Sequence, residues 1–102
     1  MAPLTPQLCR AGRALLNWPQ VRLATKSGLS ESTVRDFENE VRIPVGPKLL
    51  SMRQALENAG VIFIAAGTHH VADGPGVRLK TANPAQPSLA DGEAGIIANS
   101  EM

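Results

Sequence analysis

Gly28 lies between two short segments with helical spacing, and the residues around it restrict the fold more than any other feature of the sequence. Glycine adopts the left-handed conformation of a helix C-terminus at little steric cost, so it suits a sharp turn between helices. Counting Gln20 as position 1, small or apolar residues stand where two crossing helices must pack: Leu23, Ala24, Gly28, Leu29, Val34 and Phe37 at positions 4, 5, 9, 10, 15 and 18. Several independent steric requirements are met together, and the segment therefore predicts a helix-turn-helix unit.

Helix start signals place this unit within a set of four helices. Thr5 followed by Pro6 begins the first helix, because threonine accepts a hydrogen bond from a free backbone amide and proline suits the first helical position. Ser30 begins the third helix in the same way, and Gly46 followed by Pro47 begins the fourth. The apolar spacing then predicts helices over about residues 6–16, 20–27, 30–39 and 47–59.

After the fourth helix the pattern changes from helical to extended. β-branched and aromatic residues predict strands over about residues 61–65 and 76–80, joined by a polar, glycine-containing segment as a short hairpin. Two strands alone are marginally stable in water, so we expect them to pack on the fourth helix or to pair with another chain. The candidate dimer-forming residues on these strands are Val61, Ile62, Phe63, Ile64, Val77 and Leu79.

Length and composition limit the rest of the chain. Its 102 residues support one small domain, which we place at residues 1–80, and the proline- and serine-containing residues 81–102 are expected to form a disordered tail. The first 60 residues carry 8 Lys and Arg against 5 Asp and Glu, so the basic balance belongs to the predicted helices. One cysteine, Cys9, and the lack of a long apolar run or a signal peptide favour a cytoplasmic protein without a membrane segment.

The segment "NWPQVRLATKSGLSESTVRDFENEVRIP" resembles the Cro/C1-type (XRE-like) helix-turn-helix transcriptional regulators. It is most similar to small single-domain members in which "RALLNWPQ" precedes the motif and "GPGVRLK" follows an apolar strand. The resemblance spans roughly residues 4–80. It implies a mainly α, lambda-repressor-like domain of four helices with a short C-terminal β-hairpin.

The resemblance also implies a role for individual residues. Gln20 matches a residue that contacts a DNA phosphate at a helix N-terminus, where the partial positive charge favours an anion. Arg13 and Glu38 match a pair that ties the first helix to the third. The remaining matches are base-facing Glu31, Ser32 and Asp36, backbone-facing Thr33 and Asn39, and the flanking basic residues Arg42 and Lys48.

The chain departs from the family pattern at three positions. Pro19 replaces a serine or threonine helix cap, and Ser27 replaces an apolar residue, so the second helix is expected to be weaker. Glu40 stands where glycine is common after the third helix, and it adds an acid close to the expected phosphates.

The polar residues of the third helix have simpler interpretations as well. Glu31 and Asp36 either form a solvated helix face or accept hydrogen bonds from cytosine in the major groove. Arg35 either contacts DNA or pairs with Glu31 four residues earlier. His69 and His70 have too few neighbouring ligands for a metal and are expected in an exposed loop.

These observations favour a DNA-binding regulator over an enzyme. The chain lacks a phosphate-binding loop, a nucleophile motif and a paired-carboxylate cleft, so we expect no catalytic residues, no metal and no cofactor. We expect a homodimer that acts by occupying an operator in double-stranded DNA, as a repressor or an activator. The alternative is a helix-turn-helix fold that contacts a protein partner, as an antiactivator or antitoxin does, with weak DNA binding or none.

Overall fold

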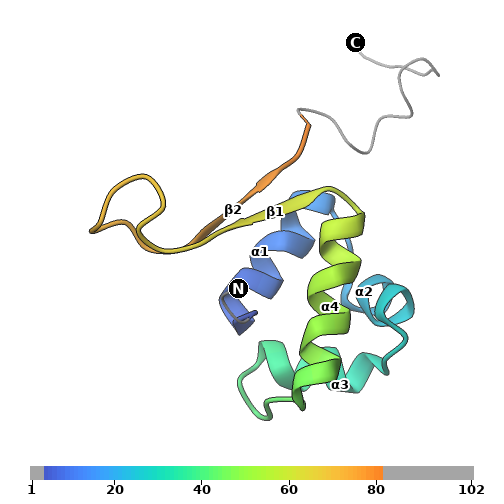
Figure 1. Ribbon diagram of the computed structural model, residues 1–102. Coiled ribbons are helices and arrows are strands. Elements are labelled where there is room, and N and C mark those ends of the chain that lie inside the picture. The colour runs from blue at the N-terminus through green and yellow to red at the C-terminus, as the bar shows by residue number, and fades with distance from the viewer. Residues whose placement is uncertain (1–3, 82–102) are drawn as a thin grey trace, which may run out of the picture.

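A computed structural model describes residues 4–81 of the protein, which form a mainly helical globule with a hairpin at one end (Figure 1). Four helices are followed by a two-stranded antiparallel sheet, as predicted, and every boundary falls within one residue of the expected one. Apart from Thr81, the expected tail lies outside the described residues. The elements are α1 (Pro6–Leu16), α2 (Gln20–Ser27), α3 (Glu31–Glu38), α4 (Gly46–Asn58), β1 (Val61–Ile64) and β2 (Gly76–Leu79).

The predicted capping residues begin and end the helices. Thr5 Oγ1 accepts a hydrogen bond from the Leu8 amide at 3.1 Å, and Ser30 Oγ accepts one from the Thr33 amide at 3.2 Å. Gly28 ends α2 with φ of 74°, the left-handed conformation that its position requires. The turn between α2 and α3 is therefore fixed by backbone geometry that a residue with a side chain would adopt only with strain.

The core is formed by residues of all four helices, together with Leu4 and Val61. α4 packs on α1 and α2, and α2 packs on α3. α1 lies close to α4 at Gly12, where an added Cβ atom would stand 3.4 Å from the Leu56 side chain. The buried apolar side chains are Leu4, Cys9, Leu23, Ala24, Val34, Phe37, Met52, Ala55, Leu56 and Val61.

The hairpin packs against α1 and α4, and its connecting loop extends beyond the helices (Figure 1). Val61 pairs with Leu79 and Phe63 with Val77. The Phe63 ring lies over the Arg53 guanidinium, 4.7 Å from it, so a cation–π contact joins β1 to α4. The hairpin and α3 lie at opposite ends of α4 (Figure 1). None of the helices within residues 4–81 is long and apolar enough to cross a membrane.

Candidate nucleic-acid interface

The two faces of α3 differ sharply in exposure. Val34, Phe37 and Glu38 are buried, with 0, 1 and 1% of their surface exposed. Glu31, Ser32 and Arg35 are exposed, while Thr33 and Asp36 are half-buried. The outward face of α3 is therefore polar and carries both donors and acceptors.

Five of the nine residues predicted to contact DNA line one hollow. The hollow has a volume of about 110 Å³ and lies between α3, the α3–α4 loop and the first turn of α4. It offers two hydroxyls, one carboxylate and two cations within a small space. Its lining residues are Ser32, Thr33, Asp36, Arg42, Pro44 and Lys48.

The backbone of the α3–α4 loop is held in place at the end of α3. The carbonyl of Asp36 accepts hydrogen bonds from the amides of Val41 at 2.8 Å and Arg42 at 3.3 Å. Glu40 makes the reversal possible by adopting φ of 63°. This left-handed conformation costs a residue with a side chain roughly 1–2 kcal/mol. Glycine would adopt this conformation without that cost.

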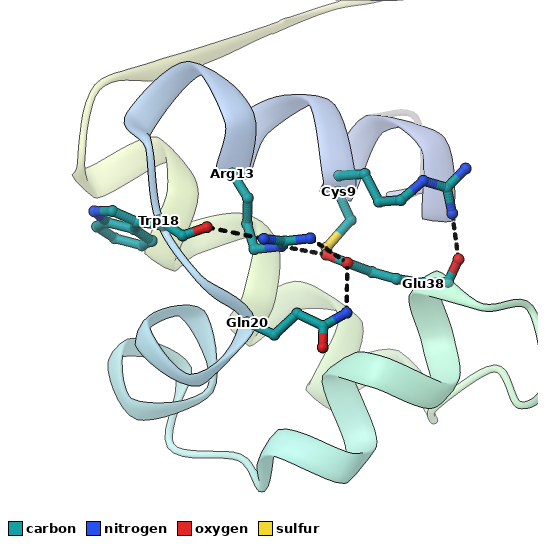
Figure 2. A network of polar contacts seen from close by, with 6 residues as sticks. Cys9, Arg13, Trp18, Gln20 and Glu38 are labelled. Atoms are coloured by element: carbon teal, nitrogen blue, oxygen red, sulfur yellow. Dashed lines mark hydrogen bonds and ion pairs between the residues drawn. The ribbon is translucent and has the colours of Figure 1, made fainter.

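Glu38 is the centre of a polar network that joins three helices (Figure 2). Arg13 Nη2 donates to Glu38 Oε1 at 2.6 Å, and Arg13 Nε donates to Oε2 at 2.7 Å. The third Arg13 nitrogen, Nη1, donates to the carbonyl of Trp18 at 2.8 Å, and Arg10 donates to the backbone carbonyl of Glu38. The structure therefore joins the two residues expected to tie the first helix to the third.

Two further side chains complete the carboxylate's hydrogen bonds. Gln20 Nε2 donates to Oε1 at 3.0 Å and Cys9 Sγ donates to Oε2 at 3.1 Å. Burial alone would raise the pKa of Glu38, but the hydrogen bonds from Arg13, Gln20 and Cys9 outweigh it and hold that pKa below its usual value. Glu38 is accordingly an ion-paired acid inside the fold, away from the outward face of α3.

The same network changes the acid–base properties of its other members. Burial, followed by the hydrogen bond to Glu38, raises the pKa of the Cys9 thiol far above its ordinary range. The hydrogen bond to Glu38 also raises the pKa of the Arg13 guanidinium. Cys9 is 0% exposed, and it is a hydrogen-bond donor in the folded protein rather than a nucleophile.

Gln20 has a structural contact in addition to the role that the family resemblance implies. Its amide nitrogen faces Glu38, while its amide oxygen points away from the carboxylate (Figure 2). It does not line the hollow, and neither do Glu31, Arg35 or Asn39. Gln20 is half-buried at the first turn of α2, where Pro19 supplies no side-chain cap.

The structure bears on one of the two interpretations of Arg35, the ion pair with Glu31. Its Nε lies 3.7 Å from Asp36 Oδ1, so its ion pair is with the adjacent residue rather than with Glu31. The side chain of Arg35 remains 52% exposed.

Sequence reasoning missed one surface beside the hollow. Val41, Ile43 and Val45 are 70, 74 and 65% exposed, although all three are apolar. They alternate with Arg42 and Pro44, which line the hollow. The signal in the sequence was this alternation of apolar residues with Arg42 and Pro44.

Other expectations have simpler outcomes. Ser27 Oγ donates to the Leu23 carbonyl at 2.7 Å, so the polar residue in α2 is satisfied locally. His69 and His70 lie in the exposed hairpin loop, and His70 Nδ1 accepts from the Ala72 amide at 3.2 Å. Within residues 4–81, no group of three or more His, Cys, Asp or Glu side chains could hold a metal ion.

A comparison of the chain with models of protein families finds no match, and neither does a comparison with curated proteins.

Proposed function

We propose that this protein is a sequence-specific DNA-binding transcriptional regulator that acts by occupying an operator as a dimer. The observation that carries the proposal is the convergence of Ser32, Thr33, Asp36, Arg42 and Lys48 on one hollow beside the outward face of α3. α3 enters the major groove, which is wide enough for a helix, and the hollow faces the adjacent sugar–phosphate backbone.

The chemistry of the hollow suits a phosphate at its rim. Arg42 and Lys48 supply positive charge, and Thr33 supplies a hydroxyl that can donate a hydrogen bond. These contacts fix the position of α3 without reading sequence. Sequence is read by the outward residues, with Asp36 accepting from cytosine and Arg35 donating to guanine or phosphate.

The Glu38 network, in the interior of the fold, holds α3 in position. It joins α1, α2 and α3 through Arg13, Gln20 and Glu38, so α3 is presented at a fixed angle. Because the charge of Glu38 is neutralised by Arg13, it does not repel phosphates from the DNA-facing side. The acids that remain outward are Glu31, Asp36 and Glu40.

Selection of bound fragments from a random double-stranded DNA library tests the proposal. The purified protein is expected to enrich a common sequence. Its affinity for that sequence should fall steeply as the salt concentration rises from about 50 to about 200 mM, as it does for proteins that contact DNA phosphates. Absence of enrichment, or binding indifferent to salt, would contradict it.

A charge reversal distinguishes sequence-specific contacts with the bases from general electrostatic attraction to DNA. Arg35→Glu should abolish binding to the selected sequence, whereas Arg78→Glu in β2, which changes the net charge equally at the other end of α4, should leave most of it. Gln20→Glu is unsuitable for this purpose, because it would place a second carboxylate beside buried Glu38.

The alternative is a helix-turn-helix fold that binds another protein. The exposed apolar side chains of Val41, Ile43 and Val45 and the outward acids Glu31 and Asp36 favour it. The DNA selection distinguishes the two functions, since a protein-binding module enriches no sequence.

A further inference from the structure

Three hydroxyl groups at the start of α3 contact one another beside the hollow. Ser30 Oγ lies 2.8 Å from Thr33 Oγ1 and 3.1 Å from Ser32 Oγ, so Ser30 is the central member of the three. Ser30 Oγ also accepts a hydrogen bond from the Thr33 amide at 3.2 Å, as the N-cap of the helix. Ser32 and Thr33 line the hollow. The hydroxyls of Ser30, Ser32 and Thr33 are here called the hydroxyl chain.

The hydrogen-bonding capacity of Ser30 limits what its two neighbours can do. A hydroxyl donates one hydrogen bond and accepts two. The Thr33 amide occupies one acceptor position of Ser30 Oγ, so one acceptor position and one hydrogen remain for the hydroxyls of Ser32 and Thr33. When both contacts are made, Ser30 therefore accepts from one of these hydroxyls and donates to the other. Only one of the two neighbours keeps a hydrogen to donate elsewhere.

The hydroxyl chain consequently has two alternative directions. In the first direction Ser32 donates to Ser30 and Ser30 donates to Thr33, which leaves the Thr33 hydrogen free. In the second direction Thr33 donates to Ser30 and Ser30 donates to Ser32, which leaves the Ser32 hydrogen free. Within residues 4–81, Ser32 and Thr33 use their hydroxyls in no other hydrogen bond, so the free hydrogen is available to a ligand.

A phosphate in the hollow selects the first direction. Arg42 and Lys48 supply the positive charge that attracts a phosphate to the hollow that Thr33 lines. Phosphodiester oxygens only accept hydrogen bonds, so Thr33 contacts one through its hydrogen. Thr33 then accepts from Ser30, and Ser30 accepts from Ser32. Ser32 is left with lone pairs alone for the base that it faces.

We propose, as a step that rests on the proposed function, that Thr33 sets the base preference of Ser32 through the hydroxyl chain. Ser32 selects adenine or cytosine while Thr33 donates to a phosphate, because these two bases present amino groups in the major groove. A serine whose hydroxyl rotates freely pairs with donors and acceptors alike. Thr33 is thus a positioning residue, since it determines which partner Ser32 accepts without touching the base.

The wrong base costs about one hydrogen bond. Guanine presents acceptors to the major groove, and thymine presents an acceptor and a methyl group. Opposite either base, Ser32 Oγ faces an acceptor unless it turns its hydrogen away from Ser30. Either outcome loses one neutral hydrogen bond, which corresponds to about a twofold to tenfold difference in affinity.

Asp36 provides an internal reference on the same helix. Its carboxylate accepts hydrogen bonds and has no hydrogen to redirect. The preference for cytosine proposed for Asp36 is accordingly independent of the hydroxyl chain, whereas the preference of Ser32 depends on it.

Selection from a random double-stranded DNA library, repeated with variants of the full chain, tests the inference. Ser32→Ala identifies the base position that depends on Ser32, since the preference should disappear there. At that position the unaltered protein should favour adenine and cytosine by about twofold to tenfold. Thr33→Val keeps the size of the side chain and the amide that Ser30 caps, and it removes the hydroxyl. Ser30 can then donate to Ser32, so the four bases should become nearly equal at this position.

Two control variants are matched to Thr33→Val. Thr33→Ser keeps the hydroxyl and should keep the preference for adenine and cytosine. Thr68→Val removes an exposed threonine hydroxyl from the hairpin loop and should change neither the preference nor the affinity. The preference at the base that Asp36 contacts should persist in all three variants.

The outcomes distinguish this inference from the proposed function. An enriched sequence without a Ser32-dependent position, or with equal use of the four bases there, would overturn the inference alone. So would a preference that Thr33→Val leaves unchanged or that Thr33→Ser abolishes. Absence of any enriched sequence for the unaltered protein would overturn the proposed function and the inference together.

Discussion

Arg13 donates two hydrogen bonds to a Glu38 carboxylate that is only 1% exposed, from Nη2 at 2.6 Å and from Nε at 2.7 Å. Removing one member of such a pair leaves a buried charge without its partner, which costs about 3–5 kcal/mol. Arg13→Met should therefore lower the free energy of unfolding by about that amount in urea titrations. Arg78→Met, which removes an exposed arginine from β2, should change it by less than about 0.5 kcal/mol.

The double variant Arg13→Met with Glu38→Leu provides the internal check. Because it removes both charges, the double variant should lose no more free energy of unfolding than Arg13→Met alone. Its loss should also be much smaller than the sum of the losses of the two single variants. Additive losses would show that the two side chains do not act as a pair.

The lowered pKa of Glu38 makes the fold sensitive to acid. A carboxyl whose folded-state pKa lies below its unfolded value contributes stability that is present above the unfolded pKa and is lost as pH falls through the folded one. The loss should therefore begin near the ordinary value of 4.5 and increase at lower pH. Glu38→Gln should flatten this acid limb in unfolding curves measured between pH 7 and pH 2, while Glu31→Gln, at an exposed position, should leave its shape unchanged.

The raised pKa of Cys9 has the opposite effect, because it makes the fold sensitive to alkaline pH. A thiol whose folded-state pKa lies above its unfolded value contributes stability that is present below the unfolded pKa, near 9.0, and is lost at more alkaline pH. The folded protein should accordingly react with a thiol reagent at pH 8 far more slowly than the unfolded chain does. A fast reaction under native conditions would show that Cys9 is not held against Glu38.

Glu40 is the residue whose replacement should stabilise the protein. Its φ of 63° suits glycine, and relief of that strain exceeds the greater chain entropy that glycine loses on folding. Glu40→Gly should raise the free energy of unfolding by about 0.5–1 kcal/mol, seen as a higher urea midpoint. Glu40→Gln keeps the strain and removes the charge, so it should not reproduce the gain.

The elements of the fold follow from short-range signals in the sequence. Thr5, Ser30 and Gly28 determine helix ends through hydrogen bonds and backbone conformations within a few residues, so their positions could be predicted closely. The strands of the hairpin followed from residue type alone. The pairing of Arg13 with Glu38 was expected from a family resemblance and not from spacing.

The composition of the network and of the hollow depends on contacts between distant parts of the chain. Cys9 and Gln20 reach Glu38 across 29 and 18 positions, and no local pattern indicates that they share one carboxylate. The partner of Arg35 was missed because helical spacing favoured Glu31, whereas the side-chain conformation brings Asp36 closer. The alternation of Val41, Ile43 and Val45 with Arg42 and Pro44 was visible in the sequence, but the exposure of the three apolar side chains depends on how the loop turns back toward Asp36.

The hollow beside α3 is proposed to contact DNA phosphates, and the salt dependence of binding by two charge-matched variants tests this contact most directly. Arg42→Ala with Lys48→Ala removes both cations of the hollow, and Arg78→Ala with Lys80→Ala removes two from the hairpin. The first variant should bind the selected DNA at least tenfold more weakly, and its slope of log affinity against log salt should be shallower by about 2 per copy. The second should match the unaltered protein in both respects, and equal effects of the two variants would contradict the account.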